Sequence, residues 1–354
     1  MKKIIFFVPT MLPHTKKLID NLRHSKYDVE VFFLHEGRIL YPWSTKHSGD
    51  AKCVENNKIL SLLEIARNAR RSDLMIITGW HSWLQVAISI WCFVIRKKQA
   101  YWLDVPEKTG PVYKKVIKKA FLYLSDAYLI TSKSGFSFFS DFYGVKRSKC
   151  FRFPYLSAFD PYADSEECIQ IRAKHSFSQE KIRVLIANRF LPRKGYESVY
   201  RAIVGLPEEV SQRLSFKILG HGYEGTDIGR KVSSLPNTEM LGWVEFEEYL
   251  ANLKDCDVYL HASDHEPYGI PPMDAMALGK VVICTNRVYS ALDCIKDQEN
   301  GFIFEPGDYS KLAAVLSDLV LSADKLSAIG NEAATTEEIP NYKDHLLALE
   351  YLTR

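Results

Sequence analysis

The chain has 354 residues, of which 47% are hydrophobic and 25% are charged. It contains no low-complexity tract, so the composition excludes a disordered or fibrous protein and allows two domains with full cores. The seven cysteines are scattered and form no CxxC pair, which argues against a zinc or redox motif and fits a reducing, cytoplasmic compartment. The longest apolar segment, Leu84–Ile95, is too short to span a bilayer.

The net charge of +3 conceals a difference between the two halves. Residues 1–150 contain 25 Lys and Arg against 12 Asp and Glu, a net of +13, and the remaining residues contain 21 against 31, a net of −10. This asymmetry indicates two domains with different partners. The basic half could face anionic lipid headgroups or nucleic acid. Nucleic acid is disfavoured, because the basic residues are not interleaved with stacking aromatics in a known module.

The N-terminal segment MKKIIFFVPTMLPH begins like a signal peptide. Its apolar run covers only Ile4–Val8 and no small-residue cleavage site follows, so we predict a first buried strand instead. Through this half, short β-rich runs alternate with helical patterns, which is typical of an α/β domain with a parallel sheet. The predicted strands are Lys3–Val8, Asp28–Leu34, Asp73–Thr78, Ala100–Asp104 and Ala127–Thr131, and the predicted helices include Ser61–Arg71 and Pro111–Ser125.

Polar residues follow two of these strands. His81 lies in TGWHSW, and Asp104 and Glu107 lie in YWLDVPEKTG. In open α/β sheets, ligands bind beyond the carboxyl ends of the strands. The three residues are therefore candidates for binding substrate hydroxyls or acting at a reaction centre, with ordinary polar strand ends as the alternative for each.

The helix predicted over PVYKKVIKKAFLYLS has two faces. One stripe contains Val112, Val116, Ala120 and Leu124 with Ile117 and Phe121 beside it, and the other face contains Lys114, Lys115, Lys118 and Lys119. Such a basic amphipathic helix could dock, together with residues 96–98, on an anionic inner leaflet. The alternative is a packed helix with a solvated lysine face. The basic half favours the membrane, because each lysine near an anionic surface adds about 1 kcal/mol.

The segment FPYLSAFDPYA, Phe153–Ala163, has two prolines and no periodicity, so it predicts a linker. We therefore predict an N-terminal domain over residues 1–155, a C-terminal domain over 164–335, and a tail over 336–354 that could pack back on the N-terminal domain. Both would be doubly wound, Rossmann-like α/β domains facing a ligand across a cleft. The strands predicted in the second half are Ile182–Ala187, Ser215–Leu219, Thr238–Leu241, Asp257–His261 and Val281–Thr285, with helices at Gly195–Val204, Phe246–Lys254 and Tyr309–Leu321.

Three strand ends in the second half carry candidate ligand groups. In IANRFLPRKG, Arg189 and Lys194 lie between a strand and a helix, which suits a diphosphate, although a solvated basic turn has the same pattern. In KILGHGYEG, Gly220 would let backbone approach a ligand, or simply form a tight turn. In LGW, Trp243 could lie near a nucleobase or in the core. The P-loop and GxGxxG patterns are both absent.

The pair Asp255 and Asp257 spells the DxD of metal-dependent sugar transferases. Asp257 begins a predicted strand and Asp255 ends the preceding helix, so we expect no convergence of the two carboxylates on one ion. We predict no metal site.

The segment HEPYGIPPMDAMALGK, residues 265–280, predicts a loop followed by a helix that opens at a proline pair and ends before Gly279. The helix N-terminus favours an anion. Met273, Met276 and Ala277 share one face and should pack on the sheet. Asp274 lies on the other side of the first turn. Glu266 in the loop and Asp274 could therefore accept hydrogen bonds from hydroxyls at two ends of one bound molecule.

The ordered set NRF…RKG, LGHG, LGW, S-D-H-E-P-Y-G-I-P-P-M-D-A-M-A-L-G-K and NGFIFEPGD resembles the retaining GT-B glycosyltransferases of family four. The resemblance covers roughly residues 180–325 and is more specific than any single motif. It implies a GT-B fold and transfer of a sugar from a nucleotide-diphosphate donor, without a bound metal or cofactor. It also implies a glycan or lipid-linked acceptor on the N-terminal side, beside His81, Asp104 and Glu107.

The resemblance implies roles for individual residues of the second half. Glu266 would contact the donor sugar, Gly269 and Ile270 would offer backbone to sugar and phosphate, and Asp274 would bind the ribose. Arg189 and Lys194 would neutralise the diphosphate leaving group, a form of electrostatic stabilisation that is usually the largest catalytic term. The remaining residues implied in the donor site are Gly220, Trp243, Val244 and Tyr268.

The chain departs from the family pattern in two places. The second carboxylate is Asp274 where relatives carry a glutamate, which is one methylene longer. PTMLPHTKKL follows the first strand where many relatives have a glycine pair. The alternatives left by the sequence are a sugar-nucleotide epimerase of the same fold and a non-catalytic sugar-nucleotide-binding protein.

Overall fold

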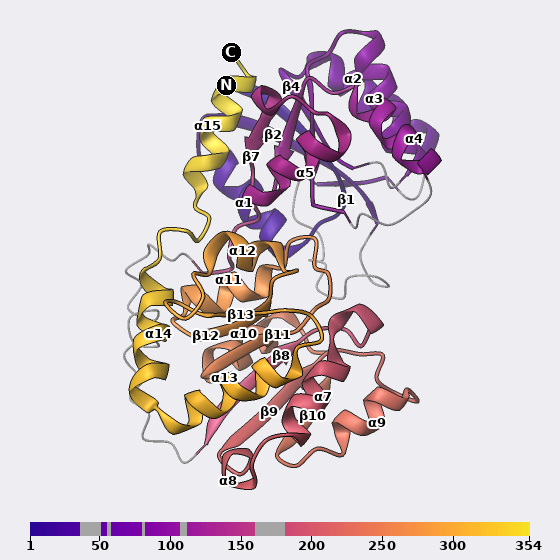
Figure 1. Cartoon of the computed structure of the whole chain (residues 1–354). Coiled ribbons are helices and arrows are strands. Elements are labelled where there is room, and N and C mark those ends of the chain that lie inside the picture. The colour runs from indigo at the N-terminus through magenta and orange to yellow at the C-terminus, as the bar shows by residue number, and fades with distance from the viewer. Residues whose placement is uncertain (36–50, 55–57, 80–81, 107–111, 160–180) are drawn as a thin grey trace. The chain divides into compact units, whose positions relative to one another are not determined.

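The computed structural model describes residues 1–35, 51–54, 58–79, 82–106, 112–159 and 181–354 (Figure 1). The chain divides into two compact units. Unit 1 comprises Met1–Ala158 and Pro340–Arg354, and unit 2 comprises Phe159–Ile339. The change of unit falls within the predicted linker segment, and the last residues of the chain belong to unit 1.

Unit 1 is built on a parallel sheet with the strand order β3-β2-β1-β4-β5-β6-β7. The central strand β1 is an unbroken apolar run whose Ile4 to Phe7 have no exposed surface, as expected for a parallel strand covered on both faces. The strands are β1 (Lys2–Thr10), β2 (Tyr27–His35), β3 (Lys52–Cys53), β4 (Leu74–Thr78), β5 (Gln99–Leu103), β6 (Ala127–Ile130) and β7 (Cys150–Arg152).

The helices of unit 1 begin at residues suited to helix starts. Pro13 opens α1, and Ser82 and Gln85 form a reciprocal capping box at the start of α3. The helices are α1 (Pro13–Arg23), α2 (Lys58–Arg71), α3 (Trp83–Val94), α4 (Val112–Leu122), α5 (Lys133–Tyr143) and the short 3₁₀ turn η1 (Arg147–Lys149).

The C-terminal helix α15 (Tyr342–Leu352) packs on unit 1, where Leu349 joins the core formed by β1 and α1 (Figure 1). Its His345 is fully buried, and the ring Nε2–H donates to the carbonyl of Pro154 at 2.7 Å. Burial lowers the pKa of His345 to about 4, because a buried imidazole resists taking a charge. The helix is thus held by a histidine that is neutral near pH 7.

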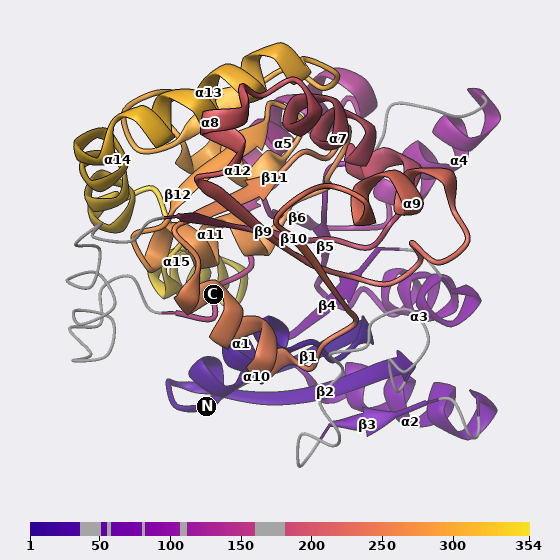
Figure 2. The ribbon, with the colours of Figure 1, turned by 90° about the horizontal axis from the view of Figure 1, so that it is seen from below.

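Unit 2 contains a second parallel sheet, of which Figure 2 labels β9, β10, β11 and β12, and the strand order of the whole sheet is β10-β9-β8-β11-β12-β13. Numbered within the unit this is 3-2-1-4-5-6, the Rossmann order, in which the direction of winding reverses between β8 and β11. The strands are β8 (Ile182–Ala187), β9 (Leu214–Leu219), β10 (Thr238–Gly242), β11 (Val258–His261), β12 (Val281–Thr285) and β13 (Phe302–Phe304).

The core of unit 2 packs helices on this sheet. Val184 and Ile186 of β8 lie in one apolar cluster with Val199 of α7 and Leu316 of α13. The helices are the 3₁₀ turn η2 (Pro192–Lys194), α7 (Tyr196–Val204), α8 (Glu208–Ser211), α9 (Asp227–Ser233), α10 (Phe246–Asp255), α11 (Ile270–Ala277), α12 (Tyr289–Cys294), α13 (Tyr309–Leu321) and α14 (Ala323–Thr335).

The ten predicted strands are all present, within one or two residues at their ends. The sequence reasoning missed β3, β7 and β13, which are only two or three residues long. The alternative of a packed apolar stripe on α4 does not hold, because Val116 and Ile117 are 61% and 63% exposed. Among the described residues, no helix has both the length and the apolar content needed to cross a membrane.

Unit 1 should lose stability as the pH falls from neutral. The unfolded chain binds a proton at His345 with the ordinary pKa of 6.5, whereas the folded chain resists protonation down to about 4. The contribution of neutral His345 to the free energy of unfolding is therefore fully present well above pH 6.5. It decreases as the pH falls, by about 2 kcal/mol between about pH 7 and pH 5. His345→Gln keeps a hydrogen-bond donor for the Pro154 carbonyl but cannot take up this proton. In urea unfolding, the free energy of unfolding of this variant should therefore change less between about pH 7 and pH 5 than that of the parent. An equal change in both proteins would contradict the role given to His345.

Candidate functional site

The candidate site lies at the carboxyl ends of β8 and β11, where the winding of unit 2 reverses. These two strands are neighbours in the sheet although they are far apart in the chain. In open α/β sheets, ligands bind at such a reversal, beyond the carboxyl ends of the strands. Asn188 and Arg189 follow β8, and His261 ends β11 before the loop that contains Glu266.

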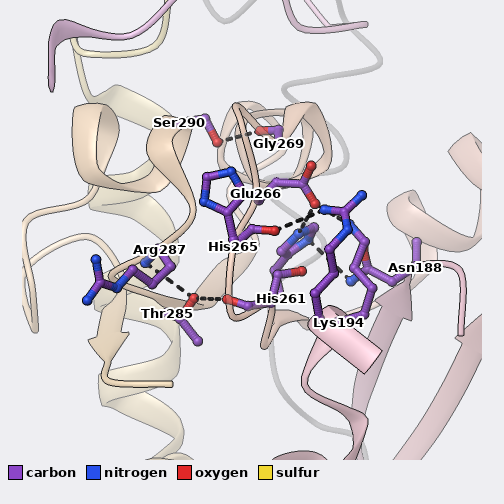
Figure 3. A network of polar contacts seen from close by, with 12 residues as sticks. Asn188, Lys194, His261, His265, Glu266, Gly269, Thr285, Arg287 and Ser290 are labelled. Carbon is purple, nitrogen blue, oxygen red and sulfur yellow. Dashed lines mark hydrogen bonds and ion pairs between the residues drawn. The ribbon is translucent and has the colours of Figure 1, made fainter. Parts of the chain in front are cut away.

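Lys194 reaches this place from the η2 turn. It is only 8% exposed, and its ammonium forms an ion pair with the Glu266 carboxylate (Figure 3). The turn can lie directly on the end of β11 because the next residue, Gly195, has φ +71°. A Cβ on Gly195 would lie 1.9 Å from the carbonyl oxygen of Ala262. Glycine is thus required for Lys194 to reach Glu266.

Glu266 is held from both its backbone and its side chain. Its N–H donates to the Arg287 carbonyl at 2.9 Å, and its carboxylate lies 3.3 Å from Nε2 of His261. Burial acts to raise the pKa of Glu266, but the hydrogen bond from His261 and the charge of Lys194 outweigh it and hold the pKa well below its usual range. The carboxylate is therefore ionised at neutral pH.

His261 connects this pair to the end of β8. Burial lowers the pKa of His261 below its ordinary value, so the ring is neutral at pH 7. An ionised carboxylate can only accept, so the ring proton lies on Nε2 and points at Glu266. Nδ1 then accepts, at 3.2 Å from the Tyr259 hydroxyl and 3.4 Å from Nδ2 of Asn188. Sequence reasoning missed His261 and Asn188, because His261 closes an apolar strand and Asn188 precedes a stronger basic signal.

The helix α11 begins next to this cluster. Gly269 precedes it with φ +90°, and its carbonyl accepts a hydrogen bond from the Ser290 hydroxyl (Figure 3). Ile270, the first helical residue, is half-buried. Met273 has no exposed surface, nor do Met276 and Ala277, as predicted. Gly269 and Ile270 thus lie within four residues of Glu266, at a helix N-terminus that favours anions.

Asp274 lies on the other side of the first turn of α11, but that side is buried as well. Only 2% of the residue is exposed, and its carboxylate accepts a hydrogen bond from the Tyr249 hydroxyl at 3.1 Å. The shorter side chain is thus held by α10. Its predicted ribose contact stays a prediction.

The other residues predicted to bind the donor lie at the same, carboxyl edge of the sheet, and they differ in how exposed they are. Arg189 is half-buried at the end of β8. Gly220 directly follows β9 with φ +139°, and a Cβ there would lie 1.9 Å from the carbonyl oxygen of Asn188. Glycine is therefore needed at this position for close backbone packing. Trp243 is 42% exposed, which excludes the core alternative. The side chains of Val244 and Tyr268 are buried, and the Tyr268 hydroxyl donates to Sδ of Met273 at 3.3 Å.

The DxD carboxylates lie at the opposite, amino edge of the sheet. Contrary to our expectation they do converge, but on the guanidinium of Arg183, which donates to Asp255 and, at 2.9 and 3.1 Å, to both oxygens of Asp257. The motif therefore forms an ion-pair network that joins β8, α10 and β11.

In unit 1, Asp104 is exposed beyond the end of β5 and accepts a hydrogen bond from the Tyr155 hydroxyl at 3.3 Å. The Tyr155 ring lies 5.0 Å from that of His14, which follows β1. Asp104 thus lies at the carboxyl edge of this sheet, as predicted. His81 and Glu107 lie outside the described residues, and so does the side chain of Lys114.

The second half of the chain matches a family model. Residues 169–336 match glycosyl transferases group 1, and this range contains Lys194, His261 and Glu266. Over this domain, the chain is similar to the glycosyl transferases group 1 family, as its motifs indicated.

Curated relatives named as glycosyltransferases are similar to part of the chain. The lipopolysaccharide core biosynthesis glycosyltransferase LpsE of Rhizobium meliloti is 27% identical over 153 residues, covering 42% of each chain. The O-antigen chain mannosyltransferase B of Escherichia coli is 26% identical over 157 residues, covering 42% of this chain and 39% of that protein. The chain spans about 40% of the length of the curated relatives it matches.

A solved structure is similar over the full length. The crystal structure of Anabaena Alr3699/HepE in complex with UDP has a TM-score of 0.75 and 17% identity, with 100% of both chains covered. The fold of the chain is GT-B, as the sequence predicted.

The close approach at Gly195 gives a stability prediction. Gly195→Ala should lower the free energy of unfolding by more than about 3 kcal/mol, because backbone atoms of Ala262 cannot move away without disrupting β11. Gly225→Ala is the matched control. Its φ is +72° and no described heavy atom lies within 4 Å of the added Cβ, so only the left-handed strain of about 1–2 kcal/mol remains. If Gly195→Ala and Gly225→Ala lower the free energy of unfolding in denaturant by the same amount, the account of the η2 turn is wrong.

Proposed function

We propose that the chain is a retaining, metal-independent hexosyltransferase. It would transfer a sugar from a UDP- or GDP-linked donor to a glycan or lipid-linked saccharide in cell-surface polysaccharide or lipopolysaccharide biosynthesis. The observation that carries the proposal is the cluster of Lys194, Glu266 and His261 at the winding reversal of the family domain. Relatives named for lipopolysaccharide core and O-antigen synthesis, and a structural neighbour that holds UDP, support it.

Glu266 is suited to the sugar end of the donor. Its carboxylate is ionised and fixed by two partners, so it can accept hydrogen bonds from sugar hydroxyls without reorganising. Gly269 places the first N–H groups of α11 in the same region. These groups would orient the sugar relative to the bond that breaks.

Lys194 and Arg189 are suited to the diphosphate. When the bond between the anomeric carbon and the phosphate oxygen breaks, the leaving nucleotide diphosphate takes the electron pair and gains negative charge. A buried ammonium beside the site stabilises that charge more strongly than an exposed one, since less water screens it. These cations would supply the stabilisation that a metal ion supplies elsewhere.

The acceptor would be bound by unit 1, where Asp104 is exposed at the carboxyl edge of the sheet. His81 and Glu107 remain candidates for the same role. We place the protein in the cytoplasm, at the inner face of the membrane. The four lysines of α4, Lys114, Lys115, Lys118 and Lys119, would face its anionic surface.

The activity test uses the purified chain with UDP- and GDP-sugars and a panel of saccharide acceptors, followed by nucleotide release and NMR of the product anomer. The proposal is supported if nucleotide is released only when an acceptor is present and if the product sugar has the same anomeric configuration as the donor sugar. Conversion of the donor sugar without an acceptor would indicate an epimerase, and binding without turnover a sugar-nucleotide-binding protein.

Two variants should separate the sugar and phosphate roles. Glu266→Gln should lower kcat by about 100-fold or more, because a neutral amide replaces the ionised acceptor. Lys194→Ala should lower kcat/KM by the equivalent of about 1.5–3 kcal/mol through the lost phosphate contact. Lys231→Ala, which removes an exposed lysine paired with Asp227, is the matched control. The role of Glu266 is wrong if its variant turns over like the parent.

Asp274→Asn tests the ribose contact. The amide is a weaker acceptor than the carboxylate, so binding of UDP or GDP should weaken by about tenfold in calorimetry. If Asp274 only braces Tyr249, the variant will lower the unfolding temperature and leave the nucleotide Kd unchanged, and the ribose role must then be abandoned.

A further inference from the structure

The two side chains that hold the Glu266 carboxylate converge on one of its oxygens. The Lys194 ammonium and Nε2 of His261 both contact Oε2, the latter at 3.3 Å (Figure 3). Within the described part of the chain, no hydrogen bond or ion pair reaches Oε1. The Glu266 side chain is 16% exposed. One oxygen is therefore held by the protein, and the other can still accept hydrogen bonds from a ligand.

The first of these partners, Lys194, can leave the pair. Its ammonium is a point charge on a flexible stem and can donate three hydrogen bonds. Among the residues that the structure describes, Glu266 is the one hydrogen-bond partner of this ammonium. The charges of Arg193 and Arg189 act on Lys194 from nearby. A diphosphate carries several negative charges, so these cations would attract it and it would compete with Glu266 for the ammonium.

The second partner, His261, is fixed in place. The residue is only 1% exposed, and its strand β11 is paired on both sides, with β8 and with β12. Nδ1 of the ring lies 3.2 Å from the Tyr259 hydroxyl and 3.4 Å from Nδ2 of Asn188. Both of these residues are buried as well. The ring therefore cannot follow a ligand, and Nε2 stays directed at Glu266.

This difference matters once a diphosphate has drawn Lys194 away. Burial is the largest influence on the pKa of Glu266, and it acts to raise the pKa, whereas the hydrogen bond from His261 is the largest opposing influence. A carboxylate left without a donor in this place would turn towards the departing ammonium or take up a proton. The hydrogen bond from His261 prevents both, because it does not depend on Lys194.

We propose that His261 is a positioning residue that holds the Glu266 carboxylate in place, with Oε1 open to the ligand, while a diphosphate takes over Lys194. The inference deepens the proposed function and rests on it, since it assumes that a sugar and a diphosphate bind at this pair. His261 itself would touch neither group. Its contribution should therefore appear only with ligands that carry a sugar.

The test compares three variants of His261 in calorimetry with the full chain. His261→Gln places an amide N–H near the position of Nε2, so it can still donate to Glu266. His261→Asn is the matched control, because its amide lies near the position of Nδ1 and cannot reach the carboxylate. His261→Ala removes both groups. UDP and GDP probe the diphosphate alone, and UDP-glucose and GDP-mannose probe the diphosphate and the sugar together.

The Asn and Ala variants should bind the nucleotide sugar that the parent binds about tenfold or more weakly, because a hydrogen bond to a charged group is lost. The Gln variant should stay within about threefold of the parent, since it keeps that hydrogen bond. All three should bind UDP or GDP within about twofold of the parent. Thermal unfolding of each variant separates a loss of fold from a loss of binding, and the comparison of Gln with Asn decides the test if the Ala variant does not fold.

Equal losses of nucleotide-sugar affinity in the Gln and Asn variants would overturn the positioning role, because only Gln keeps a donor at Nε2. A loss of affinity for UDP or GDP as large as that for the nucleotide sugar would overturn it too, since the ring would then support the whole edge of the sheet. A parent that binds neither nucleotide sugar contradicts the proposed function, and the inference fails with it. A parent that binds one, with all three variants equal to it, contradicts the inference alone.

Discussion

The buried ion pair between Lys194 and Glu266 is the interaction on which the rest of the candidate site depends. Two charges are removed from water at the end of a parallel sheet, which is costly unless each has well-placed partners. His261 supplies a further hydrogen bond to the carboxylate, and Asn188 and Tyr259 fix the ring. Ligands with both hydroxyls and phosphates offer partners to both members of the pair, which is why we propose a nucleotide sugar as the ligand of this site.

The fold makes this pair possible through backbone that only glycine tolerates. Gly195 lets the η2 turn rest on β11, and Gly220 lets β9 end against Asn188. Both contacts lie where the winding of unit 2 reverses, which is where ligands bind in open α/β sheets. Asp274 is positioned differently, since its hydrogen bond to Tyr249 ties the first turn of α11 to α10.

The sequence predicted the long strands well, because apolar runs are local signals, and strand-end motifs indicated which residues follow those strands. It could not predict what covers a helix face. The sequence left open whether the apolar stripe of α4 packs inward, because periodicity defines a face and not its neighbour, and in the structure Val116 and Ile117 are exposed. His261 was missed for a related reason, since its importance arises only when β11 pairs with β8 and brings Asn188 beside it.

The most direct test of the central claim is a crystal structure of the chain with a bound UDP- or GDP-sugar. The account predicts diphosphate oxygens within about 3 Å of Lys194 Nζ and a sugar hydroxyl donating to the Glu266 carboxylate. A donor bound at another edge of unit 2, with the Lys194–Glu266 pair untouched by it, would contradict the account.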